Sequence, residues 1–244
     1  MKNKLLALAK IHDIGNTKNP ELTVVLIHGV ASDAHTYDRA IDYLQDNLDL
    51  ERIRLISFDL LGSGKSYKSD NLNYNYSEQL SALHQSIKDI KVPIILVGHS
   101  LGTFIVTRYA KKYPAGIIRL ILISAPVYTE KDMDNPAFMV GIEAFKKAVS
   151  IKNPNYLHEK AFNNSMKNIV LKRNNYSVLA GITLPTTIIY GKEDQLIAPH
   201  NIPELAKINP HITICKTNGR HGITRDKYEV LNKLLTEELN VKNL

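Results

Sequence analysis

The chain has 244 residues, 44% of them hydrophobic and 23% charged, a composition that fits one globular domain and excludes a disordered or fibrous chain. Its net charge of +7 comes from lysines scattered among acidic residues, which indicates a solvated surface and argues against a nucleic-acid partner. No run of about 18 apolar residues is present, so we expect no membrane span. The single cysteine, Cys215, allows no internal disulfide, and Lys10 interrupts the short apolar N-terminal stretch, so we expect a cytoplasmic location.

Short apolar runs alternate with helical patterns along most of the chain. The predicted strands cover residues 5–14, 22–27, 53–58, 94–97, 117–123, 186–190 and 211–216. The predicted helices lie near residues 36–47, 78–90, 103–112, 201–207 and 225–239. Strands that alternate with helices predict an α/β fold with a doubly wound, mostly parallel sheet.

One segment interrupts this alternation. Between residues 127 and 183 the sequence has helical patterns and no strand pattern. We therefore predict a core formed by residues 1–126 and 184–244, and a helical cap formed by residues 127–183 at the carboxyl edge of the sheet, where such folds bind ligands. The apolar residues of this segment either line a substrate pocket or form the core between cap and sheet; the candidates are Phe138, Ile142, Phe145, Tyr156, Phe162 and Met166.

The strongest motif is Gly98-His99-Ser100-Leu101-Gly102, which satisfies G-x-S-x-G between a predicted strand and a predicted helix. The glycines permit a tight turn with close packing of strand on helix, and the strained turn directs the serine hydroxyl out of the fold. Ser100 is therefore the candidate nucleophile.

A second glycine-rich run, Gly62-Ser-Gly-Lys-Ser66, resembles part of a phosphate-binding loop. That loop requires a glycine where this chain has Asp59, and a carboxylate there has the wrong charge for holding a phosphate. We therefore reject an NTPase.

Taken together, these features resemble the α/β-hydrolase superfamily, in its serine carboxylesterase-like branch. The resemblance covers almost the whole chain, and its marks in order are His28-Gly29, Asp59-x-x-Gly62-x-Gly64-x-Ser66, the G-x-S-x-G turn, Gly191-Lys-Glu-Asp194 and Gly219-Arg-His221-Gly222. It implies an α/β-hydrolase fold with a helical cap. It also implies structural rather than catalytic roles for Asp59, Gly62 and Gly64.

The resemblance further implies a triad of Ser100 as nucleophile, His221 as general base and Asp194 as the acid that orients the imidazole, with the neighbouring Glu193 as a rival for that role. It places the oxyanion-binding N–H groups at Val30 and Leu101. Many relatives have glycine or proline where this chain has Ala31. Because the triad needs neither a metal nor an organic cofactor, and no metal-binding motif is present, we expect none.

We therefore expect an enzyme that cleaves small carboxylic esters through an acyl-enzyme on Ser100, with a small-molecule ester or related acyl substrate. A serine nucleophile excludes dehalogenases and epoxide hydrolases, which use aspartate. Hydrolysis of thioesters, lactones, amides or carbon–carbon bonds, and triad-based elimination, are alternatives among which the fold does not choose. The alternative outside catalysis is a ligand-binding receptor with negligible turnover.

Overall fold

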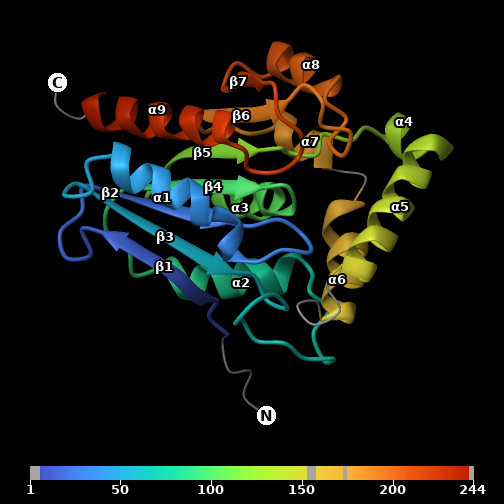
Figure 1. Cartoon of the computed structure of the whole chain (residues 1–244), viewed down its shortest axis with the longest axis horizontal. Helices are drawn as coiled ribbons and strands as arrows, with labels where there is room; N and C mark the ends of the chain where they lie inside the picture. Colours follow the sequence, from blue (N-terminus) through green and yellow to red (C-terminus); the bar gives the residue numbers. More distant parts are fainter. Residues whose placement is uncertain (1–5, 153–157, 173–174, 242–244) are drawn as a thin grey trace.

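The computed structural model describes residues 6–152, 158–172 and 175–241 (Figure 1). In these residues a single sheet has the strand order β1-β3-β2-β4-β5-β6-β7. The strands are β1 (Ala9–Gly15), β2 (Leu22–Ile27), β3 (Ile53–Asp59), β4 (Ile94–His99), β5 (Ile117–Ile123), β6 (Thr186–Gly191) and β7 (Ile212–Thr217). Only the edge strand β1 runs antiparallel to its neighbour, so the predicted mostly parallel sheet is confirmed.

Helices cover both faces of the sheet because the central strands carry apolar side chains on both sides. In β2, Val24 and Leu26 belong to one buried cluster, and Val25 and Ile27 belong to the other. The first cluster is closed by α1 (Asp38–Asn47) and α9 (Arg225–Val241). The second is closed by α2 (Tyr76–Ile87), α3 (Leu101–Lys112) and α8 (Asn201–Ile208). The doubly wound architecture is therefore present as predicted.

Local capping shifts two helix starts from their predicted positions. The helix predicted near residues 36–47 begins as a short 3₁₀ turn, η1 (Ala34–Tyr37), because the Asp33 carboxylate accepts a hydrogen bond from the N–H of His35 at 3.0 Å. Helix α2 begins at Tyr76 rather than at residue 78, because Asn75 and Glu78 form a reciprocal capping box. The predicted strand over residues 5–14 begins at Ala9, and residues 1–5 lie outside the described part.

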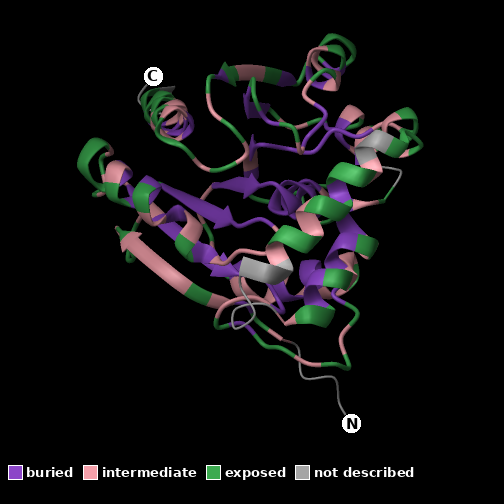
Figure 2. Ribbon diagram, turned by 45° about the vertical axis from the view of Figure 1, so that its right-hand side comes forward, coloured by how far each residue is buried: buried purple, intermediate pink, exposed green. Residues whose placement is uncertain are grey.

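A helical cap is inserted between β5 and β6. Its elements are α4 (Glu130–Met133), α5 (Pro136–Lys152), α6 (Glu159–Ser165), the π-helical turn η2 (Met166–Val170) and α7 (Asn175–Ala180). Figure 1 shows α4, α5 and α6 beyond the carboxyl ends of β3 and β4. Figure 2 shows α5 exposed along its outer face, whereas the strands behind it are buried. The insertion therefore covers the edge of the sheet where Ser100 stands, while its predicted limits at residues 127 and 183 stay a prediction.

Within the described ranges, no helix combines the length and apolarity that a membrane crossing requires.

The antiparallel edge strand is held to its neighbour by an ion pair as well as by backbone hydrogen bonds. Arg54 in β3 donates from Nε and Nη2 to the two carboxylate oxygens of Asp13 in β1, at 2.7 and 2.9 Å. This contact, with a smaller contribution from Lys10, lowers the pKa of Asp13 to about 2. The carboxylate is therefore charged wherever the protein is folded above that pH.

We predict that D13N lowers the free energy of unfolding by less than about 1 kcal/mol at about pH 7, because the pair is partly solvated. A pKa that is lower in the folded state stabilises the fold above the unfolded pKa of about 4 and loses that effect as pH falls towards 2. Urea unfolding at about pH 7 and about pH 3 should therefore show a difference from wild type that shrinks in acid. The exposed Asp89→Asn change is the control; a D13N effect that does not vary with pH would contradict the assignment.

Candidate active site

Ser100 occupies a strained turn between β4 and α3. Its φ is +50°, a left-handed value that side-chain-bearing residues rarely adopt. A Cβ on Gly98 would lie 2.6 Å from the backbone of Gly102, and one on Gly102 would lie 2.2 Å from the carbonyl oxygen of Ile27. The two glycines therefore allow α3 to begin in direct backbone contact with β2 and β4, which places Ser100 at the carboxyl edge of the sheet.

Two loops bring His221 and Asp194 to this serine. Asp194 follows β6, and His221 lies between β7 and α9. Nε2 of His221 is 2.9 Å from Oγ of Ser100, and its Nδ1 is 3.1 and 3.0 Å from the two carboxylate oxygens of Asp194. Because a carboxylate only accepts hydrogen bonds, Nδ1 carries the imidazole proton and Nε2 accepts from the serine hydroxyl. The structure thus joins the three predicted residues in one hydrogen-bonded series.

Asp194 is held in its ionised form despite its burial. Burial alone would raise the pKa of this carboxyl group, but the hydrogen bond and charge of His221 and the N–H of Leu196, at 3.0 Å from Oδ1, more than offset it. The pKa of Asp194 consequently lies below its ordinary value. Its rival Glu193 is exposed instead, with its carboxylate 3.7 Å from Nε of Arg220.

The loop after β2 brings Val30 beside Ser100. Val30 lines the same cavity as Ser100 and His221, and Leu101 opens α3, where backbone N–H groups lack partners within the helix. Ala31 adopts a φ of +58°, a conformation that favours glycine over the alanine present here. Val30 therefore lies in the same cavity lining as Ser100 and Leu101 follows the serine in sequence, while the direction of their N–H groups stays a prediction.

The loops around the site are shaped by two buried polar residues. His28 accepts a hydrogen bond from the N–H of Leu60 at Nε2 and donates from Nδ1 to the carbonyl of Gly29, at 2.9 and 2.7 Å. Burial lowers the pKa of His28, which agrees with this neutral pattern. The Asp59 carboxylate accepts from the N–H groups of Ala34 and Lys65 at 2.8 and 2.7 Å. The glycine-rich run after β3 is thus folded around a carboxylate, where a phosphate-binding loop would hold its anion.

Comparison with known proteins agrees with this arrangement. The sequence model of a family described as the alpha/beta hydrolase fold matches residues 23–145. The chain belongs to the α/β-hydrolase family. Lipase 1 of Psychrobacter immobilis is 25% identical over 221 residues, which cover 78% of this chain and 68% of that lipase. Lipase 3 of Moraxella sp. (strain TA144) is also 25% identical, over 248 residues that cover 88% of this chain and 77% of the lipase.

Solved structures show the same fold at lower identity. An esterase from Exiguobacterium antarcticum superposes with a TM-score of 0.70 at 20% identity and 94% coverage of both chains. A meta-cleavage product hydrolase from Pseudomonas fluorescens IP01 superposes with a TM-score of 0.68 at 17% identity, covering 98% of this chain and 97% of that one. These likenesses establish the fold of this hydrolase.

A narrow apolar cavity adjoins Ser100 in this α/β hydrolase. Three of the predicted pocket residues, Ile142, Phe145 and Met166, contribute to it. Phe162 lines a neighbouring cavity together with Val30, Leu101 and Ala161, so its place in a substrate pocket stays a prediction. Tyr156 and the side chain of Phe138 lie outside the described residues. Prediction from sequence missed four lining residues, Pro126, Tyr128, Val170 and Leu196.

For most of these lining residues, position along the chain indicates a place near the site. Pro126 and Tyr128 follow the carboxyl end of β5 closely, and Leu196 comes two positions after Asp194. Loops after parallel strands converge on this edge of the sheet, so they were candidates by position.

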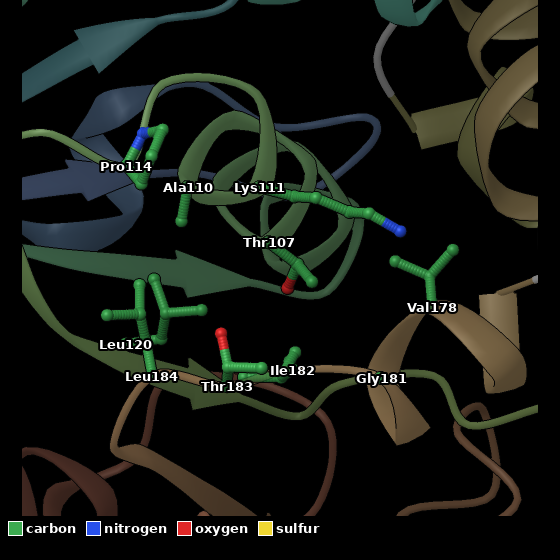
Figure 3. A pocket seen from close by; sticks show the side chains of 10 residues that line it. All are labelled: Thr107, Ala110, Lys111, Pro114, Leu120, Val178, Gly181, Ile182, Thr183 and Leu184. Carbon is green, nitrogen blue, oxygen red and sulfur yellow. The ribbon is translucent and has the colours of Figure 1, made fainter.

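A larger cavity, of ≈320 Å³, lies at the opposite end of α3 (Figure 3). Thr107, Ala110 and Lys111 of α3 face the connection from α7 to β6, including Ile182 and Leu184. Its lining has no histidine or carboxylate to pair with the Thr107 or Thr183 hydroxyl. This cavity therefore does not offer the chemistry found around Ser100.

One group in the described part of the chain brings three metal-type ligands together, namely His12, His35 and Asp38, whose ligand atoms lie within 4.8 Å of one another. Both histidines already contact the Asp38 carboxylate, at 3.2 and 3.3 Å. None of the three lines the cavity beside Ser100.

We predict that G102A destabilises the protein by about 1–3 kcal/mol, because the added Cβ must displace the backbone of β2 or α3. Urea unfolding measures the change. The control is G141A in α5, where a Cβ would meet nothing within 4 Å. Equal unfolding midpoints for the two variants would contradict the close packing described above.

Proposed function

We propose that this protein is a serine hydrolase that cleaves small carboxylic esters through an acyl-enzyme on Ser100. The observation that carries the proposal is the continuous hydrogen-bonded series from Asp194 through His221 to Ser100. The similarity to two lipases supports an ester as substrate. The cavity under the cap supplies an apolar site for the group next to the ester carbonyl.

In the proposed reaction, Oγ of Ser100 attacks the ester carbonyl carbon while Nε2 of His221 takes the hydroxyl proton. The backbone N–H groups of Val30 and Leu101 bind the negative oxygen of the tetrahedral intermediate. Collapse of the intermediate breaks the bond to the alcohol oxygen, and His221 returns the proton to that oxygen. Water then attacks the acyl-enzyme with His221 as base, which releases the acid and restores Ser100.

Asp194 supports both half-reactions without entering them. It accepts the hydrogen bond from Nδ1, which keeps Nε2 free to act as a base, and it stabilises the imidazolium formed in each step.

Since every proton and electron pair is provided by these side chains, the substrate and water, the proposed reaction uses no metal or organic cofactor. A cytoplasmic location stays a prediction.

The cap is proposed to select the substrate. The cavity beside Ser100 measures ≈20 Å³, room for about one water-sized group, so the proposal favours the shortest acyl groups. Met166 and Ile142 close this cavity from the cap side and are 1% and 3% exposed. The same triad also supports thioester or carbon–carbon bond cleavage, so a thioester belongs among the substrates tested.

We predict that S100A and H221A each lower hydrolysis of p-nitrophenyl acetate by about 10⁴-fold or more, because the two residues act as a unit. A fluorophosphonate probe should label the wild type and leave S100A unlabelled. E193Q is the matched control beside Asp194 and should retain wild-type activity. Equal labelling of S100A and the wild type would remove Ser100 from the proposed role.

We further predict that M166A shifts preference toward longer acyl groups, because truncation extends the cavity beneath the cap. The ratio of kcat/KM for p-nitrophenyl butyrate to that for the acetate should rise about tenfold. V140A, on the exposed face of α5, is the control and should leave this ratio unchanged. A uniform change for all chain lengths would place the acyl group elsewhere.

A further inference from the structure

The loop that carries His221 has little regular backbone structure of its own. Residues 218–224 join β7 to α9 without belonging to a strand or helix. The loop nevertheless has to hold an imidazole in line with Ser100, and errors of about 1 Å in such placement cost about 100-fold in rate. Its positioning therefore depends on contacts from the surrounding elements.

Three consecutive carbonyl groups of this loop accept hydrogen bonds from buried side chains. Nζ of Lys227 donates to the carbonyl oxygen of Arg220 and, at 2.8 Å, to that of Gly222. Between them, Nε2 of His99 donates to the carbonyl oxygen of His221 at 2.9 Å. Burial lowers the pKa of His99 to about 3, so this imidazole is neutral and its Nε2–H is available to the loop.

Lys227 is fully buried, and its surroundings match an ammonium group. It is 0% exposed. Besides the two carbonyl groups, Nζ contacts Oγ of Ser124 at 2.8 Å. An ammonium group would donate to all three oxygen atoms, and a neutral amine would donate to the two carbonyl groups and accept from the Ser124 hydroxyl. Ser124 is itself anchored to the sheet at the end of β5, where its N–H donates to the carbonyl of Ile189 at 2.8 Å.

At position 227 of α9, an apolar residue would be sufficient to fill the space in the core. Leu231, Leu235 and Leu239 continue the same i, i+4 stripe, and all three are buried in the core against the sheet. Burial lowers the pKa of Lys227, whereas the charges of Asp194 and Asp226 oppose that change. A charged group at the head of a leucine stripe is costly unless its hydrogen bonds are complete, as they are here.

We propose that Lys227 is a positioning residue for His221, which holds the loop by the carbonyl groups on either side of the histidine so that Nε2 faces Ser100 and Nδ1 faces Asp194. This inference rests on the proposed function. Lys227 does not contact the reacting atoms and acts only through the loop.

The test compares K227M with K233M, a matched change at an exposed lysine of the same helix. We expect K227M to lower kcat for p-nitrophenyl acetate about 100-fold with KM unchanged, because the base is misplaced while the acyl cavity is intact. K227R, which restores a cation with several donors, should recover part of kcat, and K233M should match the wild type. Wild-type kcat in folded K227M would overturn the proposal.

A second readout does not depend on turnover. The proton shared between Nδ1 of His221 and Asp194 should give a downfield imidazole resonance in the wild type and in K233M, and it should shift or disappear in folded K227M. An unchanged resonance would overturn the proposal. If K227M does not fold, K227Q, whose amide can donate to one of the two carbonyl groups, replaces it; a lower kcat than K233M supports the proposal, and an equal kcat overturns it.

The same experiments separate this inference from the proposed function. Wild-type protein that neither hydrolyses the esters nor reacts with a fluorophosphonate contradicts the proposed function, and the downfield resonance then still tests the role of Lys227. Wild-type protein that reacts, together with K227M that reacts equally fast, leaves the proposed function standing and contradicts the role of Lys227.

Discussion

The backbone contact between β2, β4 and the start of α3 is the constraint on which the candidate site depends. At Gly98 and Gly102 the chain segments approach so closely that no Cβ fits without movement of the backbone. Ser100 lies between these contacts with a left-handed φ, which the surrounding packing maintains. The proposed nucleophile is therefore placed by close backbone packing between the sheet and α3.

His221 is held by a different means. Its loop lacks a ladder of backbone hydrogen bonds, and contacts with Lys227 and His99 tie three successive carbonyl groups to the interior. The histidine side chain is then oriented by the buried carboxylate of Asp194. Each of these buried polar groups stabilises the fold only while its hydrogen-bond partners are present, because an unpaired polar or charged group in the core is strongly destabilising. The arrangement thus couples the stability of the α9 region to the alignment of the base.

The cap lines the cavity beside Ser100 with residues from two of its elements. Among the described side chains of α5, that of Ile142 is buried, and it lines the cavity beside Ser100. Met166 and Val170 reach the same cavity from η2. The cap therefore contributes side chains both to this cavity and to the buried cluster against the sheet.

The sequence by itself determined the strands, most helices and the turn that carries Ser100. Apolar runs report strands buried on both faces, and the glycines around Ser100 report a local steric requirement, so both are legible without knowledge of distant contacts. Family resemblance supplied Asp194 and His221, and the structure placed their side chains within hydrogen-bonding distance.

Only the tertiary structure decided which side chains meet across the fold. It placed Phe162 in the lining of a cavity that shares Val30 with the cavity beside Ser100, and it placed Nζ of Lys227 behind a loop to which no sequence pattern connected it. Periodicity tells which face of a helix is buried, but it does not identify the atoms that the face meets. Those contacts arise from the packing of segments far apart in the chain, such as Lys227 with Ser124, and they exist only once the sheet and helices are assembled.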